Sequence, residues 1–159
     1  MLPVLQFFTW CESSGLGNAI RESKWLFPVI ECFHLLGLSV IGGAVIIVNL
    51  RLFGLGVSTQ PVAQLWREAL PYLRWSLLVM IVSGLLLFTS EATKLYYHGA
   101  FWMKMGSLLL AIVFTFTVQR KVALKDEARV GPVWGKLVAI VSLILWTGVG
   151  VGGRWIGFS

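Results

Sequence analysis

The chain has 159 residues, of which 57% are hydrophobic and only 13% are charged. Ordinary soluble proteins carry roughly 25% charged residues, and a mean hydropathy of +0.83 indicates a chain whose solvent is largely lipid. The composition therefore excludes an ordinary soluble globular domain. The formal net charge of +6 lies mostly in short connections between apolar segments, so membrane topology explains it and no nucleic-acid partner is expected.

The N-terminal stretch has two parts. Residues 2–10 are apolar with aromatic residues near the end, and we predict a short helix that lies in the membrane interface. Residues 17–27 can then begin a helix that runs into the first long apolar segment. Residues 1–10 lack a basic region and a small-residue cleavage site, so no cleavable signal peptide is expected.

Four continuous apolar stretches are each long enough for a helix to cross a bilayer, which takes about 20 residues. They are residues 27–50, 72–90, 101–119 and 133–158. A transmembrane barrel would show short alternating segments instead. We therefore predict an all-α integral membrane protein, with residues 1–159 forming one domain, an antiparallel bundle of four transmembrane helices.

The connections between these stretches predict the topology. Residues 62–70 are expected to form a short amphipathic helix on the inner leaflet, anchored by Trp66. Four spans place both termini on one side, and eight of the 13 Lys and Arg residues fall on the opposite side. The positive-inside rule therefore predicts both termini outside and the two basic loops in the cytoplasm. The protein should contact the lipid bilayer and other membrane subunits or copies of itself.

Glu31 and His34 lie inside the first apolar stretch, where ionisable side chains are expensive and mark a functional site by default. The residues are three apart and so share one face of a helix. At a rise of about 1.5 Å per residue, Glu31, Lys104 and Arg154 each lie about 5 Å inside the outer end of a span, and His34 lies about one turn deeper. We expect these four residues to form one polar cluster in the outer half of the bundle. Glu31 would pair there with Lys104 or Arg154.

Gly148 and Gly152 bring small residues to the depth of His34. Their spacing is typical of close helix packing, and it would also leave room for a flat cofactor beside the histidine. At the other end of the first span, Asn49 and Arg51 could form a small polar lock. Cys11 and Cys32 could pair only if both face an oxidising exterior, and Cys32 is expected to be a small buried hydrophobic residue instead.

Three kinds of site fit these residues. The first is a haem b site, in which His34 is an axial ligand and Lys104 and Arg154 bind the propionates; His98, the only other histidine, is the candidate second ligand, although it lies shallower. The second is a copper site built on His34 and His98. The third is protonic, with Glu31 and His34 carrying protons or binding a quinone head group. The remaining alternative is no cofactor at all, with the charges forming internal ion pairs.

Four phrases together carry a family resemblance: FPVIECFHLLGL, NLRLFGLG, FWMKMG and GRWIGF. They resemble an uncharacterised bacterial family of small four-helix inner-membrane proteins, catalogued as a domain of unknown function and distantly like the copper-resistance D membrane proteins. The resemblance implies a four-helix fold, the bacterial inner membrane, and interest in Glu31, His34, Lys104 and Arg154. Combined with the positive-inside rule, an inner-membrane location puts both termini on the periplasmic side. The copper link is an analogy of fold.

The sequence shows no nucleophile–base arrangement, phosphate loop or zinc motif, so hydrolytic and nucleotide-driven chemistry are not expected. The expectation is a small membrane subunit or accessory protein of a bacterial redox or transport system, with a haem-binding site in the outer half of the bundle. The alternatives are a purely structural subunit with a buried ion-pair cluster, and a component of a copper or small-solute permease.

Overall fold

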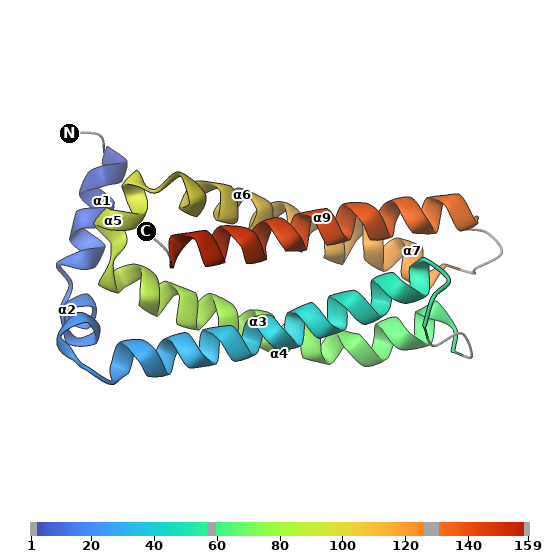
Figure 1. Cartoon of the computed structure of the whole chain (residues 1–159), viewed down its shortest axis with the longest axis horizontal. Coiled ribbons are helices and arrows are strands. Elements are labelled where there is room, and N and C mark those ends of the chain that lie inside the picture. The colour runs from blue at the N-terminus through green and yellow to red at the C-terminus, as the bar shows by residue number, and fades with distance from the viewer. Residues whose placement is uncertain (1–2, 57–59, 126–130, 158–159) are drawn as a thin grey trace.

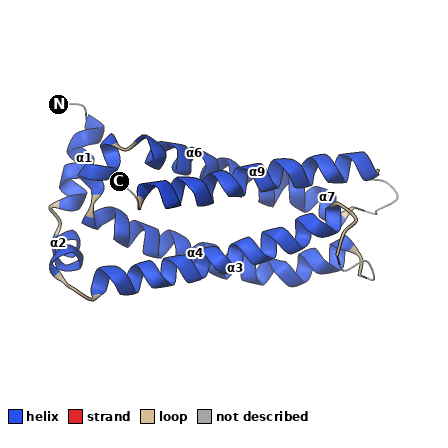
Figure 2. Ribbon diagram, in the orientation of Figure 1, coloured by secondary structure: helices blue, strands red, loops and turns tan. Residues whose placement is uncertain are grey.

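Helices make up nearly all of the computed structural model, which describes residues 3–56, 60–125 and 131–157 (Figure 2). No strand occurs within those ranges. The chain order is α1 (Pro3–Glu12), α2 (Gly15–Glu22), α3 (Leu26–Leu52), α4 (Val62–Ser90), α5 (Ala92–Tyr97), α6 (Gly99–Phe114), the π-helical segment η1 (Thr115–Gln119), α7 (Arg120–Leu124) and α9 (Pro132–Ile156). Since α6, η1 and α7 follow one another without a break, they form a single long helix.

Four of these helical segments are long and apolar enough to cross a membrane: Leu26–Leu52, Val62–Ser90, Gly99–Leu124 and Val133–Ile156. They run up and down in two pairs, α3 with α4 and α6 with α9, and a smaller contact joins α3 to α9 (Figure 1). The prediction of an all-α bundle of four membrane-spanning helices is therefore confirmed.

Both chain termini lie at one end of the bundle, beside α1, α2 and α5 (Figure 1). We call this the terminal end, and we call the opposite end, with the connections after α3 and after α7, the loop end. Figure 1 shows α3 further from α9 at the terminal end than toward the loop end. The predicted N-terminal helix is present as α1, and its Phe8 ring packs edge-on against Phe88 at a centroid distance of 4.9 Å.

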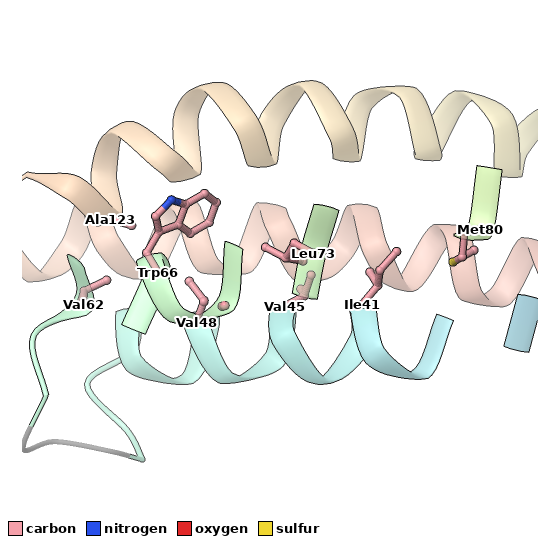
Figure 3. Close-up of a cluster of buried hydrophobic side chains, with 9 residues drawn as sticks. Ile41, Val45, Val48, Val62, Trp66, Leu73, Met80 and Ala123 are labelled. Carbon is pink, nitrogen blue, oxygen red and sulfur yellow. The ribbon is translucent and has the colours of Figure 1, made fainter. Parts of the chain in front are cut away.

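The main hydrophobic cluster lies in the loop-end half, between α3, α4 and α7 (Figure 3). Trp66 is its largest member, only 1% exposed. The expected surface helix over residues 62–70 is therefore wrong, because these residues are the first turns of α4, which continues through Pro71. Packing of the indole against the cluster that includes Val48 and Ala123 buries more apolar surface than an interfacial position would.

The two cysteines are both free thiols. Cys11 belongs to α1 and is buried in a small cluster with Phe8 and Ala92. Cys32 is exposed on the outer surface of α3, so the expectation that it is a small buried residue is wrong. The two side chains therefore occupy different environments and form no disulfide in this structure.

Candidate functional site

His34 is the polar residue that α3 presents to α4. Its Nδ1 lies 2.9 Å from the hydroxyl oxygen of Ser83, and that hydroxyl donates its own proton to the carbonyl of Val79 at 2.6 Å. A serine oxygen whose one proton is already donated can only accept from a further partner. The Nδ1–H of His34 is therefore the donor, and Nε2 of the neutral ring keeps a lone pair for a ligand or a proton.

Gly84 makes this ring position possible. A methyl group at Gly84 would lie 3.2 Å from Cε1 of His34, closer than a side-chain carbon normally approaches without displacement of its neighbour. The α4 segment next to His34 thus provides a hydrogen-bond acceptor at Ser83. The next residue, Gly84, has no side chain and so leaves room for the ring. Together they hold the imidazole in one orientation against α4.

Lys104 is the second member of the site and comes from α6. Its side chain is partly buried and runs along α9, where a methyl group at Gly153 would lie 3.5 Å from its Nζ atom. Its ammonium group lies within electrostatic range of the imidazole of His34. The structure therefore brings together two of the expected cluster residues, His34 and Lys104.

Glu31 does not join them. The residue is exposed and makes no ion pair with any other residue that the structure describes, so the expected pairing with Lys104 or Arg154 is absent. Asn49 lies 18 positions later, about five helical turns, and so shares the same face of α3. Asn49 is 0% exposed because α3 and α9 are in contact at its level. Toward the terminal end α3 diverges from α9 (Figure 1), and Glu31 is exposed there.

Arg154 and His98 also lie away from the centre of the site. Arg154 is exposed near the C-terminal end of α9. His98 forms the junction between α5 and α6, six positions before Lys104 and therefore about 9 Å nearer the terminal end along that helix. The structure thus places His98 nearer the terminal end than Lys104.

The glycines of α9 serve close packing against α6. A methyl group at Gly148 would lie 2.9 Å from the hydroxyl of Ser107, and one at Gly152 would lie 3.0 Å from Cβ of Lys104. Gly150, in contrast, has nothing within 4 Å of a methyl group in that position. Gly148 and Gly152 are therefore occupied by α6, and the room for a flat cofactor that the sequence left open is not at these two positions.

A second polar cluster lies in the loop-end half, and the sequence indicated only one of its members. Asn49 donates to the hydroxyl of Ser142 at 3.1 Å, Ser142 donates to the amide oxygen of Gln119 at 3.2 Å, and Gln119 donates back to Asn49 at 2.9 Å. This closed ring joins α3, η1 and α9. The expected lock between Asn49 and Arg51 is wrong, because Arg51 instead donates to the carbonyl of Gln60.

The ring was missed because its other two members look ordinary in the sequence. Gln119 ends the third apolar stretch and reads as an interfacial residue, and Ser142 is a small residue in an apolar run. The π-helical turn of η1 carries both Thr115 and Gln119 to buried positions, each 1% exposed, and Trp146 donates to the Thr115 hydroxyl at 3.1 Å. A hydropathy pattern does not predict a π-turn. The one available signal was the presence of three hydrogen-bonding side chains in apolar spans.

No group of three or more His, Cys, Asp or Glu side chains within the described residues is arranged to hold a metal ion. The site at His34 accordingly offers one nitrogen ligand and one neighbouring cation. Four long apolar helices with polar side chains gathered on their inner faces define the class of this protein as a four-helix, multi-pass membrane protein.

The chain belongs to a family of unknown function (DUF6644), whose model matches residues 7–159. This match covers nearly the whole chain and agrees with the expected uncharacterised family. No curated protein and no solved structure matches the chain, so no link to the copper-resistance D proteins is shown.

Proposed function

We propose that this protein is a small haem b-binding subunit of a redox system in the bacterial inner membrane, with His34 as an axial ligand. The observation that carries the proposal is the hydrogen bond between His34 Nδ1 and Ser83. Histidines that ligate a metal commonly donate their other ring N–H to a fixed acceptor, which sets the tautomer and raises ligand basicity. With Nδ1–H donated to Ser83, Nε2 is the atom available to the iron.

Lys104 favours haem over copper. A haem carries two propionates, and a partly buried ammonium near the ligand would pair with one of them. The same ammonium would repel a copper ion held by His34, and Met103 and Met105, the thioethers nearest in sequence to Lys104, are both exposed, 46% and 43%. The bound haem would supply one-electron chemistry, and the chain's own residues would hold and orient it.

The proposed orientation places this site near the periplasmic side. Eight of the 13 basic residues lie toward the loop end, and the positive-inside rule assigns that end to the cytoplasm. His34 lies eight positions after the start of α3 at the terminal end, about 12 Å along the helix. An electron entering or leaving at this site would therefore exchange with a partner on the periplasmic side.

The test is a visible absorption spectrum of the purified full chain, before and after addition of haemin in detergent. The wild-type protein should show a Soret band, and His34→Ala should lose it. Ser39→Ala is the matched control, because Ser39 is exposed on the same helix and bonds only the carbonyl of Leu35. A wild-type chain that never gives a protein-bound Soret band, or a band unchanged in His34→Ala, would contradict the proposal.

A structural subunit without a cofactor is the second candidate, and the exposure of Glu31 favours it. A carboxylate on the outer face of a membrane-spanning helix is stabilised when a neighbouring subunit supplies a cation. If Glu31 serves this role, Glu31→Gln should dissociate the native complex in a mild detergent, as measured by gel filtration, while the absorption spectrum stays unchanged. A haem subunit would differ in two respects, because it would show a Soret band and its Glu31→Gln variant would keep the assembly of the wild type.

A further inference from the structure

A small pocket opens at the loop end, far from His34. Its volume is about 240 Å³. The end of α3, the first residue of α4, the end of α7 and the start of α9 contribute its walls, so all four long helical segments meet there. Gly135 allows the close approach of α9, since a methyl group at that position would lie 3.4 Å from the carbonyl oxygen of Leu52.

The described residues that line this pocket carry charge of one sign. Arg51, Lys125 and Lys136 are basic, and none of the described lining residues is acidic. Among the described residues, the one carboxylate in the loop-end half is Glu68, which accepts a hydrogen bond from Gln64 at 2.9 Å. Residues 126–130, which lie outside the described residues, include two acidic residues and one basic residue.

The geometry of the backbone adds to this positive charge. Gly131 lines the pocket with φ at 66°, a conformation that suits glycine. It is the N-cap residue of the 25-residue helix α9. The first amide groups of a helix have no partner within the helix and point toward an anion placed at its N-terminus. Arg51, which lines the same pocket, donates from its Nε to the carbonyl of Gln60 at 2.8 Å.

We propose that this pocket binds a phosphate group, which is the chemistry shared by an anionic phospholipid head group and by free inorganic phosphate. Basic pockets between transmembrane helices on the cytoplasmic side bind anionic lipid head groups in this way. The neighbouring surface of α9 suits a lipid source, because Val133 and Leu137 are 69% and 48% exposed and would contact its acyl chains. The inference does not depend on haem binding at His34.

The experiment measures the unfolding temperature of the purified full chain in neutral detergent as phosphatidylglycerol, phosphatidylcholine or inorganic phosphate is added. Phosphatidylglycerol should stabilise the wild-type protein at a lower concentration than phosphatidylcholine. In the double variant Lys125→Gln with Lys136→Gln, the half-saturating concentration of phosphatidylglycerol should rise about 30-fold, since each basic residue near an anionic head group contributes a factor of about five.

Two control variants separate the pocket from the charge of the whole protein. Lys24→Gln with Lys94→Gln removes the same charge at the terminal end and should leave binding unchanged, whereas Lys125→Arg with Lys136→Arg should bind as tightly as the wild type. Stabilisation by inorganic phosphate that matches that by phosphatidylglycerol would support the pocket and assign its ligand to the soluble source. The proposal is overturned if both Gln double variants weaken binding equally, or if neither phosphate source stabilises the wild type.

Discussion

The Nδ1 atom of His34 and the hydroxyl of Ser83 lie 2.9 Å apart across the interface of α3 and α4, although 49 positions separate them in the chain. Because the Ser83 proton is donated to the carbonyl of Val79, this contact fixes which ring nitrogen carries hydrogen. The orientation of the imidazole is therefore set by a different helix from the one that carries it. The chemistry available at Nε2 depends on the packing of α3 against α4.

Removal of the serine hydroxyl should weaken this site without destroying the fold. In Ser83→Ala, His34 loses the acceptor for its Nδ1–H, and haem affinity should fall by about 10- to 100-fold, as is typical when a partner of a metal-ligating histidine is removed. The measurement is a titration of the chain with haemin followed at the Soret band. Equal haem affinities for Ser83→Ala and the control Ser39→Ala would show that the contact does not orient a ligand.

The packing of α6 against α9 predicts a contrast between two glycines two positions apart. In Gly152→Ala the new methyl group would lie 3.0 Å from Cβ of Lys104 and 3.3 Å from its Cα, and these atoms can move only if the helices separate. We expect destabilisation of about 1–3 kcal/mol, the usual cost of overpacking. Thermal unfolding in detergent measures it.

Gly150→Ala is the matched variant, because nothing lies within 4 Å of a methyl group at that position. It should be neutral or stabilising by up to about 1 kcal/mol, since alanine has the higher helix propensity. Equal destabilisation by both substitutions would contradict the close approach of α6 to Gly152.

The ring of Asn49, Gln119 and Ser142 predicts non-additive mutational effects. Gln119→Leu leaves the oxygen of Asn49 and the proton of Ser142 without partners in a buried site, which should cost about 1–3 kcal/mol. The triple variant N49L/Q119L/S142A removes every partner at once and should be destabilised by less than the sum of the three single changes.

The free energy of unfolding of each variant can be measured by titration of the folded protein with a denaturing detergent. Gln64→Leu is the control, because Gln64 is an exposed glutamine bonded to Glu68, and its replacement should fall within about 0.5 kcal/mol of the wild type. Strictly additive effects within the ring would show that the three side chains act independently.

At the terminal end, Glu12 predicts a dependence of stability on pH. The carboxylate accepts the backbone N–H of Thr93 at 2.6 Å, at the start of α5, and forms an ion pair with Arg21 at 3.2 Å. Hydrogen bonding to Thr93, together with the charge of Arg21, outweighs desolvation and lowers the pKa of Glu12 below its ordinary value of 4.5.

A lowered pKa in the folded state means that folding favours the ionised carboxylate. The contribution of Glu12 to stability is therefore fully present above pH 4.5 and is lost as the pH falls through the lowered pKa. The protection factor of the Thr93 amide against hydrogen exchange, which corrects for the intrinsic effect of pH on exchange, should fall over this range in the wild type. In Glu12→Gln the protection factor should already be lower at neutral pH and should not fall further on acidification. A wild-type protection factor that stays constant under acid would contradict the role of Glu12 as a cap for α5.

Much of the fold follows from the sequence. Four apolar stretches of about 20 residues can cross a bilayer only as helices, because backbone groups in lipid must be paired within their own segment. The number of spans, the location of both termini at one end and the polar character of His34 and Lys104 within apolar spans follow from length, hydropathy and depth. These properties depend on one helix at a time, so a linear pattern is sufficient to predict them.

The partners of each side chain were decided by tertiary structure alone. Glu31 and Asn49 occupy the same face of α3, yet one is exposed and the other buried, because α3 contacts α9 near the loop end and diverges from it toward the terminal end. Trp66 likewise lies in a segment whose sequence suits an interfacial helix. It is nevertheless buried, because α4 continues through Pro71 and brings it to the core. Depth in the membrane is fixed by the distance along one helix, whereas contact depends on the angle and rotation of two helices, and no single-helix pattern contains that information.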